Sequence, residues 1–337
     1  MARVNPKNAK EYYERGNERY EDRDYDGAIA DYTESLVLDP DNAQTLSIRG
    51  LAWSKKGEHE KAVNDLNEAV RLDPHNAGIW QTRGMVWHKK GEYDEAINDF
   101  TEAVCLAPSY AFAWYFRGLA WKRKGKLDKA IEDYSEAIRL DPKEVNFLRM
   151  RGAAWEMKGD LDKAIGDFSE VIRLKPDNAE SWFIRAHAWK RIGKPDRAIA
   201  DFTEAIRLNP KEASFFSGRG ITWGQNGEED KAIDDLNQAI RLYPSNAEDW
   251  YNRAVAWRNK GEYDKAIDDY NEAIRLDPND AMVWNNRSVC WWIKGERDKA
   301  IADIDEAIRL NPNLQKAIEF RDVVLNGKNK RNNRRAR

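Results

Sequence analysis

Proline recurs in this chain at a fixed interval of 34 residues, and that interval constrains the fold more than any other feature of the sequence. Only Pro195 lies out of register. A period of this length is typical of stacked supersecondary units, each too small to bury its apolar face without a neighbour. The prolines in register are Pro6, Pro40, Pro74, Pro108, Pro142, Pro176, Pro210, Pro244, Pro278 and Pro312. Counted from Ala9, the period divides the chain into nine repeats: 9–42, 43–76, 77–110, 111–144, 145–178, 179–212, 213–246, 247–280 and 281–314.

The apolar spacing inside each repeat predicts two helices. In the fourth repeat, Trp114, Gly118 and Trp121 lie at i, i+4 and i+7 and therefore share one face of a first helix. Gly125 is expected to end this helix, because glycine readily takes the left-handed conformation of a C-terminal cap. A second stripe of the same spacing runs to Pro142, which cannot continue the helix and directs the chain into the next repeat.

Tryptophan is unusually frequent, with 14 residues, and most of them take one position of the repeat. Alanine stands at the twentieth position of all nine repeats. A large ring packed over a small residue lets two helices approach closely. We therefore expect these rings in the core, and a loss of about 3–5 kcal/mol for Trp155→Ala. The eleventh-position residues are Trp53, Trp87, Trp121, Trp155, Trp189, Trp223, Trp257 and Trp291.

The remaining regular positions complete a recognisable pattern. Position 4 is Trp, Tyr, Leu or Phe, position 8 is Gly, Ala or Ser, position 24 is aromatic or aliphatic, and position 27 is mostly Ala. This pattern resembles the tetratricopeptide repeat over residues 9–314. The resemblance implies an all-α fold, an α-solenoid of helix-turn-helix repeats that forms a right-handed superhelix, with partner peptides bound in a concave groove lined by the first helices. The first repeat departs, with Arg19 in place of Trp and Arg23 in place of Gly, and both suit an exposed terminal repeat.

The two ends of the chain differ from the repeats. Residues 1–8 are expected to be an N-terminal lead. Residues 315–326 carry an amphipathic helical pattern and resemble the capping helix of this family, with Gly327 as its expected end. Residues 327–337 are expected to form a basic disordered tail. Its segment 328–337 could touch nucleic acid or anionic lipid, or serve only solubility.

Arginine at position 7 and aspartate at position 23 occur in all nine repeats, from Arg15 to Arg287 and from Asp31 to Asp303. One hypothesis makes the arginines a ladder for a ligand. The other pairs each arginine with an aspartate across the helix hairpin or between repeats, because a hairpin that turns near position 15 brings positions 7 and 23 level. We favour pairing, since a groove that reads one ligand should vary along its length.

By the same resemblance, positions 2, 5, 9, 12 and 13 of the first helix face the groove, and here the repeats differ from one another. Lysine and arginine gather at positions 12 and 13, with aromatic residues beside them at positions 2, 5 and 6. We predict a protein-binding scaffold that holds an extended, acidic partner segment with one or two apolar anchors. The alternative is a solvated basic face with aromatics packed between repeats. The predicted partner-binding residues are Lys89, Phe112, Tyr115, Phe116, Lys122, Arg123, Arg149, Phe183, Lys190, Arg191 and Tyr251.

Two other functions compete with a peptide-binding scaffold. One is an RNA-binding helical repeat, which reads one base per repeat, although a net charge of −3 disfavours nucleic acid. The other is a structural solenoid that associates with itself through its first repeat. A carboxylate clamp for chaperone tails is not supported, because Tyr13 and Leu51 replace its lysine and its second asparagine. The sequence leaves the oligomeric state and the partner's identity open.

The sequence does not predict an enzyme. The four histidines lack metal-ligand spacing, and Cys105 and Cys290 are too few for a metal site or a disulfide framework. We therefore expect no catalytic residue, no metal and no cofactor. Without a signal sequence or an apolar run of membrane-spanning length, the sequence predicts a cytoplasmic protein that does not enter the membrane.

Overall fold

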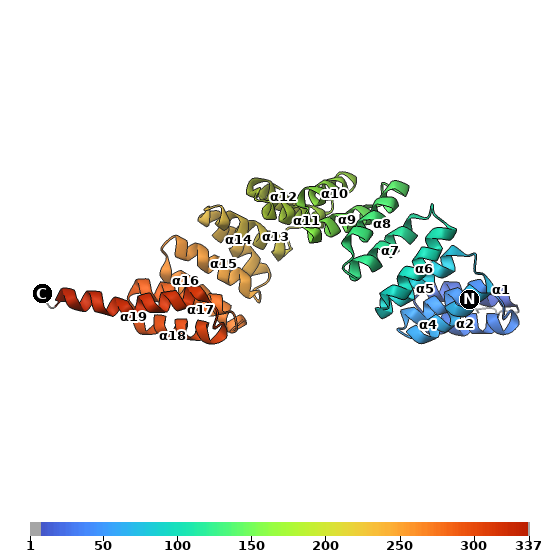
Figure 1. Cartoon of the computed structure of the whole chain (residues 1–337), viewed down its shortest axis with the longest axis horizontal. Coiled ribbons are helices and arrows are strands. Elements are labelled where there is room, and N and C mark those ends of the chain that lie inside the picture. The colour runs from blue at the N-terminus through green and yellow to red at the C-terminus, as the bar shows by residue number, and fades with distance from the viewer. Residues whose placement is uncertain (1–7, 336–337) are drawn as a thin grey trace, which may run out of the picture. The chain divides into compact units, whose positions relative to one another are not determined.

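The computed structural model describes residues 8–335, with the side chains of residues 8–326. Within this range the chain forms nineteen α-helices and no strand (Figure 1). It divides into two compact parts, Met1–Leu174 and Lys175–Arg337, called here the N-terminal half and the C-terminal half. The all-α solenoid of helix hairpins is therefore confirmed.

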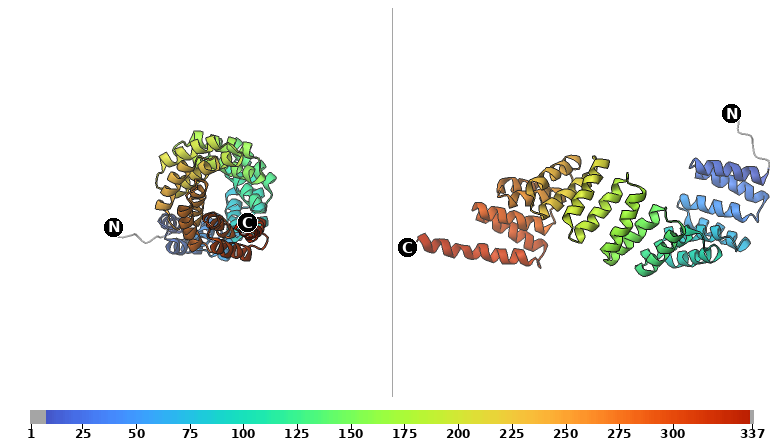
Figure 2. Two further views of the ribbon diagram at one scale, coloured as in Figure 1. Left: turned by 90° about the vertical axis from the view of Figure 1, so that its left-hand side faces the viewer. Right: turned by 90° about the horizontal axis from the view of Figure 1, so that it is seen from above.

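Each repeat contributes an antiparallel pair of helices, and the pairs stack side by side within each half (Figure 2). The first helices are α1 (Ala9–Glu21), α3 (Ala43–Lys55), α5 (Ala77–Lys90), α7 (Ala111–Arg123), α9 (Val145–Lys158), α11 (Ala179–Arg191), α13 (Ala213–Gln225), α15 (Ala247–Asn259) and α17 (Ala281–Lys294). The second helices are α2 (Tyr25–Leu38), α4 (His59–Leu72), α6 (Tyr93–Leu106), α8 (Leu127–Leu140), α10 (Leu161–Leu174), α12 (Pro195–Leu208), α14 (Glu229–Leu242), α16 (Tyr263–Leu276) and α18 (Arg297–Leu310). The last helix is α19 (Gln315–Arg335).

Glycine ends the turn between the two helices of a repeat, as predicted for Gly125. Eight repeats place a glycine there with φ between 72° and 89°, the left-handed region that residues with a Cβ avoid. In the first repeat the position is Arg23, which takes a φ of 63° at a steric cost. Pro195 begins α12, where a missing N–H costs nothing.

The tightest contact inside a hairpin joins position 8 of the first helix to position 24 of the second. A Cβ added to Gly118 would lie 2.7 Å from the ring of Tyr134, and one added to Gly152 would lie 2.6 Å from that of Phe168. The rings at position 24 are almost completely buried. The principle of a large ring over a small residue therefore holds at positions 8 and 24. The predicted positions 11 and 20 also pack in one cluster, as for Trp223 and Ala232.

The tryptophans at position 11 are partly buried and pack against the buried clusters, so they lie at the edge of the core rather than fully inside it. Trp155 packs against a buried cluster that includes Ala130 and Ile131 of the preceding repeat, and the Lys163 Nζ lies 4.2 Å from its ring centroid. These rings join neighbouring repeats, because the pitch between hairpins brings position 11 to the seam. The loss for Trp155→Ala is accordingly expected below the range for a core aromatic.

The pairing of position 7 with position 23 is confirmed in every repeat, across the helix hairpin. Arg151 donates from Nε and Nη2 to the two carboxylate oxygens of Asp167, at 2.9 and 2.7 Å. Its third nitrogen, Nη1, donates to Ser135 of the preceding repeat at 3.0 Å. The ligand-ladder hypothesis is wrong, because these guanidinium groups are part-buried and already occupied.

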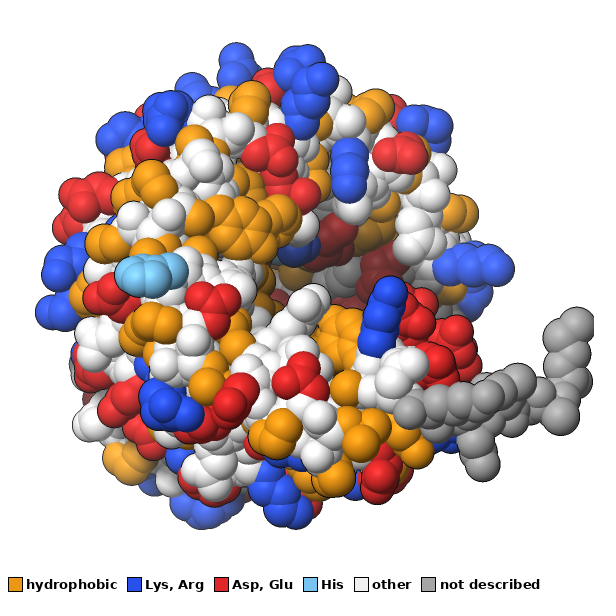
Figure 3. Space-filling model, turned by 90° about the vertical axis from the view of Figure 1, so that its right-hand side faces the viewer, with side chains coloured by type: hydrophobic (Ala, Val, Ile, Leu, Met, Phe, Trp, Pro, Cys, Tyr) orange, Lys and Arg blue, Asp and Glu red, His pale blue; other side chains and the backbone are white. Residues whose placement is uncertain are grey.

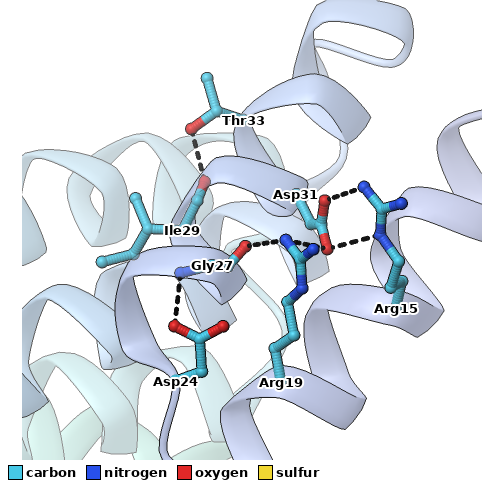
Figure 4. Close-up of polar contacts among 7 residues, drawn as sticks. All are labelled: Arg15, Arg19, Asp24, Gly27, Ile29, Asp31 and Thr33. Atoms are coloured by element: carbon cyan, nitrogen blue, oxygen red, sulfur yellow. Dashed lines mark hydrogen bonds and ion pairs between the residues drawn. The ribbon is translucent and has the colours of Figure 1, made fainter. Parts of the chain in front are cut away.

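The first repeat adds a second arginine to this pair (Figure 4). Arg15 holds Asp31 as in the other repeats, and Arg19 donates to the carbonyl of Gly27 at 3.0 Å while its Nη1 lies 2.9 Å from the Asp31 carboxylate. Arg19 stands where eight repeats have tryptophan. A polar side chain with two partners within its own hairpin therefore takes the place of the ring.

Within each half, first helices of consecutive repeats also touch one another, as α3 touches α5 and α13 touches α15. Among the described residues, consecutive second helices make no comparable contact. Each half therefore curves with its first helices on the inner side, which is called the inner face below.

The capping helix is longer than predicted. Ala317 and Val324 of α19 are buried against Ile304 and Ala307 of α18, as expected for a cap on the last repeat. The backbone remains helical to Arg335, so α19 continues past the end expected at Gly327. One glycine costs a helix only about 1 kcal/mol, and no proline follows it to force a stop. Residues 1–7 of the lead and residues 336–337 lie outside the described range.

Candidate partner-binding surfaces

Five basic side chains on the first helices of the N-terminal half are called here the cationic stripe, and they fall into two groups of neighbours. They are Lys55 of α3, Lys89 of α5, Lys122 and Arg123 of α7, and Arg149 of α9. Burial and the nearby charge of Lys55 lower the pKa of Lys89. Burial also lowers the pKa of Lys122, and Arg123 and Arg149 add to that shift. Lys55 and Lys89 form one group of neighbouring charges, and Lys122, Arg123 and Arg149 form the other.

Most other cations of the repeats are neutralised within the chain. Lys56 and Lys124 form ion pairs with Asp26 and Asp94 of the preceding repeats, and Lys90 pairs with Glu60 at 2.5 Å. On the outer surface at the N-terminal end of the chain, basic and acidic side chains are interspersed (Figure 3). In the cationic stripe, by contrast, no carboxylate of the described residues lies within 4.0 Å.

The aromatic residues predicted beside the stripe serve mainly to join repeats. Phe116 stacks on Phe100 of the preceding repeat with centroids 5.8 Å apart. Tyr115 packs on Phe147 of the following repeat at 5.0 Å. These two residues fit the alternative of aromatics packed between repeats. Phe112 touches Phe147 by an edge but remains 38% exposed, whereas Tyr115 and Phe116 are partly buried, so Phe112 is the most exposed ring of the three.

The other predicted residues belong to the C-terminal half. Phe183 of α11 packs on Phe202 and Phe215, and Tyr251 of α15 accepts a hydrogen bond from Asn286 at 2.9 Å. Burial lowers the pKa of Lys190, partly offset by Glu248. Arg191 is exposed. The predicted residues thus form two separate groups, one on each half.

The variety at position 5, read from the sequence as a sign of ligand contact, has a packing cause in several repeats. Gln81, Ser217 and Asn285 at this position are all buried. Position 5 lies against position 3 of the next repeat, as in the contacts of Tyr115 with Phe147 and of Ser217 with Asp249. The residue at position 5 therefore has to fit the residue at position 3 of the adjacent hairpin in these repeats.

A hollow on the C-terminal half was not predicted. It has a volume of about 740 Å³ and lies over α13, between α11 and α15, and it is called here the α13 hollow. Phe183, His187 and Lys190 line one side, and Glu248 and Asp249 line the other. The sequence signal that could have found it is the run of small residues on α13, Ser214, Ser217 and Gly218 at positions 2, 5 and 6.

Neither a metal site nor a membrane span is found in the described part of the chain. No group of three or more His, Cys, Asp or Glu side chains is arranged to hold a metal ion. Among the described helices, none is both long and apolar enough to cross a bilayer.

Comparisons with known proteins agree with the fold. Sequence profiles described as the tetratricopeptide repeat match residues 13–77, 77–110, 111–144, 153–213, 185–247, 247–280 and 283–314. Because these matches cover most of the sequence, the chain belongs to the tetratricopeptide repeat family. No curated protein matches it.

Several solved structures are similar to this one. A tetratricopeptide repeat protein from Parabacteroides merdae has a TM-score of 0.56 and 19% identity, over 74% of this chain and 99% of that one. The Cut9–Hcn1 assembly of the APC/C has a TM-score of 0.53 and 17% identity, over 94% and 76%. PilF of Pseudomonas aeruginosa has a TM-score of 0.54 and 17% identity, over 63% and 96%. At these identities the likenesses show the fold alone, and with the family they define a protein-interaction scaffold.

Proposed function

We propose that the N-terminal half binds an extended, acidic segment of a partner protein along its inner face. The observation that carries this proposal is the cationic stripe, whose two groups of neighbouring cations lie on consecutive first helices without a carboxylate partner. The arginines at position 7 and the lysines that join repeats have carboxylate partners within the chain. The side chains of the stripe do not, so they can bind an external anion. Aspartate and glutamate of a partner supply the missing charges and speed its association.

Phe112 is the proposed apolar anchor for this segment. It lies on the same helix as Lys122 and Arg123, and its exposed ring is held in place by the edge contact with Phe147. Burying a preorganised aromatic ring against an apolar partner residue supplies affinity that charge pairs at a wet surface do not. The proposed site thus combines steering by charge with one anchor.

The proposal also includes the predicted contacts of the C-terminal half, the absence of catalysis and the cellular location. Phe183, Lys190, Arg191 and Tyr251 are proposed partner contacts of the C-terminal half. We also propose that the protein is a non-enzymatic scaffold of the cytoplasm, where cysteines stay reduced. Both cysteines, exposed Cys105 and buried Cys290, are free thiols.

The proposal is tested with a short fluorescein-labelled peptide of alternating glutamate and leucine, followed by fluorescence anisotropy. The test variant changes Lys89, Lys122, Arg123 and Arg149 to glutamate. The control variant changes Lys56, Lys90, Lys124 and Lys158 to glutamate. These lysines are ion-paired and lie near the C-terminal ends of first helices of the same half. Because both variants have the same net charge, they separate a local site from general attraction.

We expect the test variant to bind the peptide at least about tenfold more weakly, and the control within about twofold of the wild type. Equal losses in the two variants would mean that net charge, not the stripe, attracts the peptide. Tighter and strongly salt-dependent binding of polyuridylate RNA would instead favour the RNA-binding alternative.

A further inference from the structure

The α13 hollow exists because side chains are missing from a face that other repeats fill. At positions 2, 5 and 6, α7 carries Phe112, Tyr115 and Phe116, whereas α13 carries only serine and glycine. At Gly218 the ring of Phe202 approaches so closely that an added Cβ would lie 2.6 Å from it. The helix backbone therefore forms the floor of the hollow, and the space above it is open to solvent.

A buried carboxylate without a counter-ion lines this hollow. Asp249 is 1% exposed, and it accepts hydrogen bonds from Ser217 Oγ at 2.5 Å and from Asn246 Nδ2 at 2.9 Å. Both donors are neutral. Every other buried aspartate of the described chain stands at position 23 and holds an arginine at position 7. A buried charge that lacks a partner of opposite sign is costly.

Helix capping does not account for this carboxylate. Asp249 lies in the first turn of α15, where the helix dipole favours a negative charge by only about 0.3–1 kcal/mol. At the same position, α3 and α11 carry Thr45 and Ser181, which are also buried and also follow an asparagine cap. A neutral side chain is therefore sufficient for folding at this position. The carboxylate of Asp249 is not explained by the needs of the helix start.

The remaining walls suit a long side chain with an apolar stem. Phe183 and Ile221 line the interior, and Leu242 with Tyr243, which is 57% exposed, lies at the mouth. Glu248 adds a second carboxylate on the side of Asp249. Lys190 and Lys211 are the basic groups of the lining, and with Glu212 the carboxylates outnumber them. Glu248 has Lys190 as a neighbouring charge, whereas Asp249 has only neutral hydrogen-bond partners. The hollow thus combines apolar lining residues with one carboxylate that lacks a counter-ion.

We propose that the α13 hollow is a socket for an arginine side chain of a partner protein, with its guanidinium at Asp249 and its stem against Phe183 and Ile221. A guanidinium matches the planar carboxylate with paired donors and stacks on aromatic faces, which an ammonium does less well. The socket rests on residues of the C-terminal half alone, so it stands or fails independently of the acidic segment proposed for the N-terminal half.

The first test uses two small probes, N-acetyl-arginine amide and N-acetyl-citrulline amide, on the full chain. Citrulline has nearly the shape of arginine but no charge. The readout is the methyl resonance of Ile221 in a ¹H–¹³C spectrum of methyl-labelled protein. We expect saturable shifts with the arginine probe, at an affinity at least about tenfold above that of citrulline. Equal affinities, or no shift at Ile221, would overturn the proposal.

Variants locate the binding in the socket. Asp249→Thr, which copies Thr45, is expected to weaken the arginine probe at least about tenfold while leaving citrulline unchanged. Ser214→Phe, which copies Phe112, fills the hollow and is expected to abolish both. The control is Met282→Phe, the same position on α17, which should bind like the wild type. Circular dichroism verifies the fold of each variant, and undiminished arginine binding by Asp249→Thr would refute the assignment.

Discussion

Helices α7 and α13 are the first helices of their repeats, but their inner faces carry side chains of contrasting size and charge. α7 fills its inner face with aromatic rings and carries basic side chains that lack partners, whereas α13 leaves that face empty beside a buried carboxylate. Both keep the glycine turn, the arginine at position 7 and its aspartate. The glycine turn and the arginine–aspartate pair are called here the repeat frame. The comparison teaches that this frame and the inner surface use different positions of the repeat, so the surface can change while the frame is kept.

The largest expected effect tests whether the frame is shared by the two halves. Arg151→Ala and Arg219→Ala each leave a buried aspartate without its guanidinium, so each should lose about 3–5 kcal/mol of unfolding free energy. Urea unfolding measures the losses. Combining Arg151→Asp with Asp167→Arg should recover part of the loss, and cycles of Arg151 with Asp133 or Asp201 should show no coupling.

The matched control for this prediction is Arg139→Ala, which removes an exposed arginine paired with Glu136 and should leave the unfolding midpoint unchanged. If Arg151 and Arg219 differ widely in their losses, the frame is not equivalent in the two halves.

Two glycines of α13 should respond to alanine with opposite signs. Gly218→Ala places a Cβ against the buried ring of Phe202, so we expect a loss of about 1–3 kcal/mol. Gly224→Ala meets Ala232 at an ordinary 3.6 Å and should stabilise the helix by about 0.5–1 kcal/mol. Thermal unfolding compares the two variants. A tolerated Gly218→Ala would mean that the floor of the hollow is not rigid.

The buried carboxylate of the hollow predicts a pH-dependent difference. Burial raises the pKa of Asp249, so the folded state holds its proton more tightly than the unfolded chain. Stability therefore falls as the pH rises from the unfolded pKa, about 3.9, through the raised folded pKa. Asp249→Thr removes this penalty and should be about 1–2 kcal/mol more stable at neutral pH.

Urea unfolding at neutral and acid pH measures this difference, which should shrink as the pH falls. The exposed Glu180→Gln provides the control, with no expected change. A variant Asp249→Thr that is less stable than the wild type at neutral pH would show that the carboxylate supports the fold.

The smallest expected effects concern the tyrosines at position 24. Tyr134 has a buried hydroxyl with no hydrogen-bond partner among the described residues, and Phe168 and Phe202 occupy the same place in other repeats. Tyr134→Phe should therefore be neutral or stabilise by up to about 1 kcal/mol. Tyr32 donates to Asn17 at 2.9 Å, so Tyr32→Phe should lose about 0.5–1.5 kcal/mol. Thermal unfolding ranks the pair, and the reverse order would contradict this account.

The repeat pattern was sufficient to predict the helix hairpins, the glycine turns and the arginine–aspartate pairs. These features depend on contacts within one hairpin, and a hairpin is specified by spacing along the chain, as Gly125 and the pair of Arg151 with Asp167 show. Of the predicted partner residues, Lys122 and Arg123 of α7 have Arg149 of α9 as a neighbouring charge. Tyr115 and Phe116 were expected to face a partner, but their rings pack mainly against neighbouring hairpins.

What the sequence by itself determined is therefore the hairpin and its period, because both follow from which residues recur and how far apart they stand. The tertiary structure alone decided that Trp155 lies at a seam, that α19 continues beyond Gly327, and that small residues on α13 leave a hollow beside Asp249. The physical reason is that burial at these places depends on the pitch between neighbouring hairpins. That pitch is set by the packing of whole helix surfaces, which no single spacing along the chain records.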